Sequence, residues 1–272
     1  MSMYTDLIDN LEVLNLQNIK NTLPGYLDEM KDKNISFTEM LYDLTKEEIK
    51  YQTERAAKVN IKVSAFPFEK TINDFDFSYQ PSVDKNELYD LETLRFMEKN
   101  ENIVFIGTSG VGKTHLAVGI GMAAAKRRIS TYYITFNDLI NQLVKANSEN
   151  RADIKIKYFC KYKLLIIDEI GYLPITKEGA YLFFQLINKR YEKKSTILTT
   201  NQVFSKWADV FGDSVVTAAI IDRIVHHSHI IKIKGQWYRI KDRNVEINKV
   251  IEKDGVYNDS KRNDDICRCS NR

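Results

Sequence analysis

The segment that most constrains the fold is a glycine-rich stretch, GTSGVGKT, at residues 107–114. It fits the pattern G-x-x-x-x-G-K-[ST] without deviation, and it lies between an apolar run, NIVFIG, and a stretch that favours a helix. In such a strand–loop–helix unit, backbone N–H groups and the positive end of the helix face a phosphate. The segment predicts a nucleotide site, whose candidate residues are Gly107, Thr108, Ser109, Gly110, Val111, Gly112, Lys113, Thr114 and His115.

A second motif, LLIIDE at 164–169, supplies acidic groups for the same site. Its four apolar residues predict a buried strand that delivers Asp168 and Glu169 to the carboxyl edge of a sheet, where ligands of open α/β folds bind. We expect Lys113 to reach the β- and γ-phosphates, and Thr114 and Asp168 to hold Mg²⁺. Glu169 is expected to orient and polarise the attacking water. Either motif alone also fits a turn or loop that binds nothing, but together they predict a site of nucleotide hydrolysis.

Strand-like and helix-like segments alternate from residue 102 onward. The expected strands are 102–107, 130–136, 163–169 and 195–201, with helical patterns between them. This alternation predicts an α/β fold with a central parallel sheet flanked by helices. Asn201 ends the last of these strands, where its amide suits a contact with the γ-phosphate or the attacking water, although Asn is also common in ordinary turns.

The N-terminal part shows a helical pattern without strand-like segments. Residues 1–65 show helical spacing, with an expected break at LPGY (23–26) and a capping box at SFTE (36–39). The aromatic segment 66–85 is expected to be a connector that packs onto the next domain. We therefore divide the chain into a small helical N-terminal domain for partner or DNA contacts (1–67), an ATPase domain (68–243) and a polar tail (244–272).

Composition and the first residues bear on the cellular location of such a chain. No apolar run approaches the roughly 18 residues that a membrane span needs, and the first residues lack the form of a secretion signal. The three cysteines, Cys160, Cys267 and Cys269, form no disulfide framework. We therefore expect a cytoplasmic protein with no membrane contact.

Charge is unevenly distributed along the chain. Residues 1–60 carry 7 Lys/Arg against 11 Asp/Glu, whereas residues 126–163 carry 9 against 3 and residues 223–272 carry 12 against 7. Basic segments of this kind fit nucleic-acid contact or a solvated lysine-rich surface. Without a helix-turn-helix pattern, we expect contacts mainly to the DNA backbone. The candidates are the KRR stretch at 126–128 and Lys155, Lys157, Lys161 and Lys163.

Three of the four histidines, His226, His227 and His229, lie close together. No nearby cysteine or suitably spaced carboxylate completes a tetrahedral metal site. We therefore interpret them as the end of a helix followed by a hairpin over 230–240, with a glycine at its turn.

Four blocks together resemble a known family: ENIVFIGTSGVGKTHLA, LLIIDEIGYLP, TTNQVFSKWADVFGD and AAIIDRIVHHSHIIKIKGQWYR. They are similar to the IstB-like helper ATPases of insertion sequences, relatives of the DnaC-type helicase loaders in the AAA+ superfamily, over about residues 8–241. The resemblance implies a P-loop AAA+ core and an ATP-dependent oligomer that binds double-stranded DNA and assists a transposase. A helicase loader and a scaffold that binds ATP without hydrolysing it are the alternatives.

The resemblance also assigns roles to individual residues. It places Lys113 and Thr114 in Walker A, Asp168 and Glu169 in Walker B, and Asn201 at sensor 1. Arg223 falls at the arginine-finger position, from which it would act on a neighbouring subunit, or else it forms a surface pair with Asp222. Arg239 falls at the sensor-2 position. Two departures bear on Arg239: relatives usually have a small residue where Trp237 stands, and no room for a helical lid follows residue 241.

Overall fold

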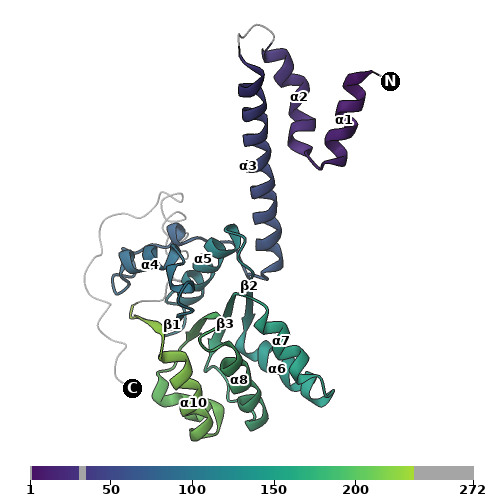
Figure 1. The fold of residues 1–272 in the computed structure, drawn as a ribbon. Coiled ribbons are helices and arrows are strands. Elements are labelled where there is room, and N and C mark those ends of the chain that lie inside the picture. Colours follow the sequence, from purple (N-terminus) through teal and green to yellow (C-terminus); the bar gives the residue numbers. More distant parts are fainter. Residues whose placement is uncertain (1, 31–34, 236–272) are drawn as a thin grey trace, which may run out of the picture.

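The centre of the molecule is a five-stranded parallel sheet (Figure 1). The computed structural model describes residues 2–30 and 35–235. The strands lie in the order β2-β3-β4-β1-β5, and every neighbouring pair is parallel. Their bounds are β1 Asn102–Gly107, β2 Thr131–Thr135, β3 Leu164–Ile170, β4 Ser195–Thr200 and β5 Ser228–Ile233. The predicted α/β fold is thus confirmed, and the segments that follow β3, β4 and β1 leave adjacent strands at one carboxyl edge.

Helices cover both faces of this sheet, because alternate strand residues feed two separate cores. In β1, Ile103 and Phe105 belong to one core, while Val104 and Ile106 belong to the other. The first core is covered by α4 (Lys85–Glu92) and α5 (Lys113–Lys126). The second is covered by α6 (Phe136–Ser148), α7 (Ala152–Cys160), α8 (Lys177–Arg190), α9 (Trp207–Phe211) and α10 (Ser214–Val225). Such two-sided burial explains why the strands read as continuous apolar runs.

The aromatic connector packs onto α5. It contains the short helix η1 (Ile72–Asp74), and the side chains of Ile72 and Phe75 are buried. A Cβ at Gly119 would lie 2.8 Å from Ile72 Cδ1 and 3.0 Å from the Ile72 backbone nitrogen, so the connector packs closely on α5 at this position. Two further short helices are η2 (Arg95–Met97) and η3 (Phe204–Lys206).

Three helices precede the connector: α1 (Met3–Val13), α2 (Gln17–Met30) and α3 (Phe37–Val63). The capping box forms at the start of α3, where the Ser36 backbone N–H donates to Glu39 Oε2 at 2.9 Å. The C-terminal part of α3 packs on α5, while α1 and α2 lie away from the sheet (Figure 1).

The expected helix break at residues 23–26 is wrong, because α2 continues through Pro24. The buried residues of α2, Ile19 and Leu23, precede Pro24 and pack with α1 and α3. Beyond Pro24, Tyr26 OH donates to Asp43 Oδ2 of α3 at 3.5 Å, and the helix continues at the cost of one backbone hydrogen bond.

Some sequence predictions fall outside the described residues. Arg239, Trp237, the second strand of the expected hairpin and the tail 244–272 all lie there. Within the described part, β5 pairs in parallel with β1. None of the helices described combines the length and apolar character needed to cross a bilayer.

Candidate nucleotide site

The glycine-rich loop joins β1 to α5 in the predicted strand–loop–helix form. Gly112, at φ 100°, is the N-cap of α5, and a Cβ there would lie 2.6 Å from Phe75 Cε2. The connector therefore presses on the loop at a position that only glycine can occupy. Lys113 is almost fully buried, and its Nζ donates to Gly107 O at 2.8 Å and to Thr108 O at 2.7 Å. The ammonium group thus lies within the curl of the loop.

Asp168 links the two motifs. Its carboxylate is only 2% exposed and accepts from Thr114 Oγ1 at 3.0 and 3.1 Å. Two further hydroxyls converge on it: Tyr133 OH donates at 2.6 Å from β2, and Thr199 Oγ1 donates from β4. Burial and then the neighbouring Asp168 raise the pKa of Tyr133 far above its usual range, so the phenol stays protonated and remains a donor. Four elements thus meet at this carboxylate.

Glu169 leaves the strand in an unusual conformation. Its φ is +66°, and the pairing of β3 with β4 shifts register between Ile167 and Ile170. A left-handed non-glycine residue costs about 1–3 kcal/mol and is concentrated at functional sites. The Glu169 backbone N–H donates to Thr199 Oγ1 at 2.9 Å, which holds this bulge in place. The result is an exposed carboxylate directly beside a buried one.

A cavity of about 170 Å³ opens over the glycine-rich loop. Besides Lys113, Thr114, Glu169 and loop residues, its walls include four residues that we did not predict, namely Phe68, Lys70, Tyr172 and Thr199. Tyr172 OH is 3.1 Å from Ser109 Oγ, so the loop after β3 reaches across to the glycine-rich loop. The sequence signal for Phe68 is the aromatic character of the connector, which by itself indicates only packing.

His115 lines the cavity as predicted, but it also holds the connector. Its Nε2 lies 2.9 Å from Thr71 O, and its ring makes an edge contact with Phe75 at 5.4 Å between centroids. Burial lowers the pKa of His115, so the neutral ring is favoured. The histidine therefore joins the start of α5 to the segment that carries Phe68.

Asn201 follows β4 and faces the loop that follows β3. Its Oδ1 is buried, has no hydrogen-bond partner among the described residues, and would lie 3.2 Å from a Cβ built on Gly171. A buried amide oxygen without a partner is unusual and needs an explanation. Asn201 does not line the cavity itself.

Arg223 lies at the other edge of the sheet. Its Nε donates to Asn188 Oδ1 at 2.8 Å, and its guanidinium carbon is 4.9 Å from the centre of the Phe184 ring. It lines a small recess together with Asn102 and Thr196, which stand at the amino ends of β1 and β4. The structure therefore does not bring Arg223 to the cavity of its own chain, and its side chain is held by α8 and not by Asp222.

Residues 9–245 match the model of the family described as IstB-like ATP binding protein. The chain belongs to this family. A protein of Bacillus thuringiensis subsp. berliner, named for ATP binding in insertion sequence IS232, is 51% identical over 239 residues, which cover 88% of this chain and 96% of the relative. A Geobacillus stearothermophilus protein, named in the same way for IS5376, is 44% identical over 79% of this chain and 86% of its own.

Solved structures agree on the fold. AMPPCP-bound DnaA from Aquifex aeolicus superposes with a TM-score of 0.52 at 21% identity, covering 70% of this chain and 60% of its own. At that identity the likeness shows the fold alone, a P-loop AAA+ core. The family assignment makes the chain an ATP-binding protein, and its P-loop fold with the site described above is that of an ATPase. The relatives named above are proteins of insertion sequences.

Proposed function

We propose that this ATPase assembles on double-stranded DNA and assists the transposase of its own insertion sequence. The observation that carries the proposal is the separation of its parts: Lys113, Asp168 and Glu169 meet at one cavity, whereas Arg223 lies at the opposite edge of the sheet. A hydrolytic site that must take its arginine from another subunit is regulated by assembly. Relatives named for insertion sequences support the biological setting.

The residues present fit a magnesium ion. Thr114 Oγ1 and the Asp168 carboxylate offer hard oxygen donors at the mouth of the phosphate loop, which is the donor set that Mg²⁺ prefers. When bound there with ATP, the ion would neutralise charge on the β- and γ-phosphates. The donor chemistry thus supports Thr114 and Asp168 as its ligands.

The protein groups divide the remaining work of hydrolysis. Lys113 binds the phosphates with a fixed positive charge, and Glu169 orients and polarises the attacking water. Thr199 is a positioning residue, because its one hydroxyl touches both the Asp168 carboxylate and the Glu169 backbone. The partnerless Asn201 amide oxygen supports a sensor role, since it needs an N–H or O–H donor that the described residues do not supply.

The DNA surface that we propose is a basic recess at the amino edge of the sheet. Arg127, Lys163, Lys193 and Lys194 line a cavity of about 410 Å³, and among the described residues Glu98 is the only acidic one in its lining. Arg127 and Lys163 belong to the segments predicted from charge, whereas Lys193 and Lys194 do not. Lysine and arginine neutralise phosphates without reading sequence, which fits binding to any duplex. The helices α1–α3 are left to contact protein partners.

The test compares the purified full chain with a Lys113→Ala variant. We expect ATP hydrolysis that DNA stimulates and that the variant lacks. In a pull-down with ATP and DNA, we expect capture of the transposase encoded by the same element. Capture of a replicative helicase instead would replace the proposed partner, and a wild-type rate no higher than that of Lys113→Ala would remove the proposal altogether.

A further inference from the structure

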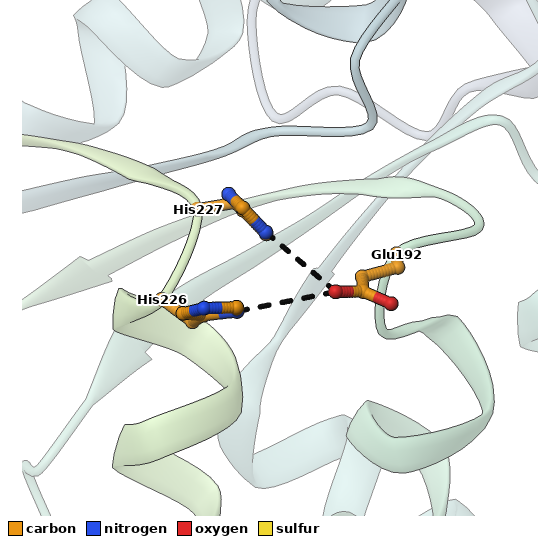
Figure 2. Close-up of side chains that lie close together, drawn as sticks. All are labelled: Glu192, His226 and His227. Atoms are coloured by element: carbon orange, nitrogen blue, oxygen red, sulfur yellow. Dashed lines mark ion pairs between the residues drawn. The ribbon is translucent and has the colours of Figure 1, made fainter.

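A carboxylate and two imidazoles converge outside the nucleotide site. Figure 2 shows Glu192, in the turn after α8, facing the adjacent residues His226 and His227 at the end of α10. Glu192 Oε1 lies 3.6 Å from His227 Nε2 and 4.0 Å from His226 Nδ1. One ligand atom from each residue lies within 4.8 Å of the other two, and all three side chains are exposed.

The backbone around each residue is fixed. Glu192, at φ 57°, stands in the turn that follows α8, and the N–H groups of Lys193 and Lys194 donate to Arg190 O at 3.0 Å to close this turn. His226 is the C-cap of α10. His227 immediately precedes β5, and its carbonyl accepts from the Asn102 N–H at 2.7 Å. The side chains can therefore rotate while their attachment points remain in place.

We propose that these three residues form a binding site for a first-row transition-metal dication such as Zn²⁺. Two imidazole nitrogens and a carboxylate oxygen are a donor set that Zn²⁺ accepts, whereas Mg²⁺ and Ca²⁺ prefer oxygen alone. Metal–ligand bonds of about 2.0–2.2 Å require the donor atoms to draw in by roughly 1 Å. Rotation of exposed side chains supplies that movement, and the fourth tetrahedral position faces solvent.

A direct hydrogen-bonded pair does not explain the cluster. Distances of 3.6 and 4.0 Å exceed the length of a hydrogen bond. The third histidine of the stretch, His229, lies outside the cluster, with its Nε2 2.9 Å from Glu101 Oε2. His226 Nδ1 has a partner of its own, the Tyr191 hydroxyl at 2.6 Å, so a bound metal ion would have to displace this hydroxyl.

The position of the cluster gives the metal a structural effect. Glu192 follows α8 and His226 caps α10, so a bound ion would tie the ends of these two helices together. The same two helices hold Arg223, through its bond to Asn188. The nearby Lys193 and Lys194 repel a cation, so the free energy of binding comes from the ligand bonds and not from the local field.

The experiment measures Zn²⁺ and Co²⁺ binding to the full chain without an affinity tag. Cys267 and Cys269 are replaced by serine in a parallel sample, because thiolates are alternative ligands. We expect one ion per chain in both samples, and a Co²⁺ spectrum without thiolate-to-cobalt charge transfer. Zn²⁺ affinity is expected to fall about tenfold or more in Glu192→Gln and in the double variant His226→Ala/His227→Ala. His229→Ala is the matched control and is expected to bind like the wild type.

Thermal unfolding gives a second measurement that does not depend on spectra. Saturating Zn²⁺ is expected to raise the Tm of the wild type and of His229→Ala by on the order of 5 °C, and to leave the double variant unchanged. Loss of binding in the serine-substituted sample would assign the ion to the cysteines and overturn the proposal. Equal affinity in the double variant and the wild type would overturn it as well.

Discussion

At the scale of single residues, the two neighbouring carboxylates of the nucleotide site share one threonine. Thr199 Oγ1 donates to Asp168 and accepts from the Glu169 backbone, so it holds the buried acid and the bulged acid in register. We expect Thr199→Val, which keeps the shape and removes the hydroxyl, to lower kcat for ATP about 10- to 100-fold. The KM for ATP should change little, because the substitution leaves the loop groups that hold the phosphates unchanged.

Ser195 offers the matched control for this substitution. It begins the same strand, and its buried Oγ has no hydrogen-bond partner among the described residues. Steady-state ATPase assays on Thr199→Val and Ser195→Ala, with nucleotide affinity measured separately, distinguish positioning from general damage to β4. Equal activity of the two variants would show that the threonine does not position the acids.

At the scale of elements, a single buried arginine joins a helix to two other segments. Arg190 ends α8 and is 1% exposed; its guanidinium donates to Ser195 O at 2.6 Å and to both Phe159 O and Tyr162 O at 3.0 Å. Burial lowers its pKa to about 10, so it stays charged at neutral pH. We expect Arg190→Met to destabilise the fold by about 3 kcal/mol, because it leaves buried carbonyls without donors.

Thermal unfolding checks this second prediction, with a fall in Tm of roughly 10 °C expected for a chain of this size. Lys189→Ala is the control, since Lys189 is the preceding residue and makes only an exposed ion pair with Asp153 at 2.7 Å. It should leave the midpoint nearly unchanged. If both variants unfold at the temperature of the wild type, the carbonyls bonded to Arg190 find other donors or water.

A third prediction concerns the contribution of the basic recess at the amino edge of the sheet to DNA binding. Charge removal in Lys193→Ala/Lys194→Ala is expected to weaken duplex binding equally for all sequences. It should also reduce the slope of log K against log salt by about 0.9 for each phosphate that is no longer neutralised. Fluorescence anisotropy over a salt series measures both quantities. Lys85→Ala serves as a basic control outside the recess, since Lys85 stands at the start of α4 and its Nζ lies 5.8 Å from the centre of the Phe77 ring. An unchanged slope in the double variant would place the DNA elsewhere.

Elements that depend on local signals were predictable from the sequence, and contacts between distant segments were not. The strand that carries Asp168 and the loop that leads to Thr114 are each recognisable from a local sequence motif. The contact between these two residues was predictable because the carboxyl ends of parallel strands lie at one edge of the sheet. Nothing local indicated that Glu192 would face His226 and His227, since they belong to different helix–strand units. Beyond Pro24, the contact of α2 with α3 through Tyr26 and Asp43 likewise joins segments that are separate in the sequence.

At the scale of the whole molecule, the proposed function divides one hydrolytic site between the two edges of the sheet. The cavity with Lys113 and Glu169 opens at the carboxyl edge, and Arg223 stands beside the amino ends of β1 and β4. No side-chain rotation carries Arg223 across the sheet to the cavity of its own chain, so under the proposed function it acts on the nucleotide of another copy. Such an arginine contributes about 10³–10⁵ in rate in well-studied NTPases. Hydrolysis should therefore depend on protein concentration.

Mixing of two inactive variants tests this arrangement. Arg223→Ala and Glu169→Gln are each expected to be inactive alone, whereas a 1:1 mixture creates some interfaces with an intact Glu169 on one side and an intact Arg223 on the other. Random assembly places about a quarter of the interfaces in this productive state. A mixture of Arg223→Ala with the double variant Arg223→Ala/Glu169→Gln contains no such interface and is the control. If the first mixture hydrolyses ATP no faster than the control, while chain exchange is verified by labelled subunits, Arg223 does not act between copies.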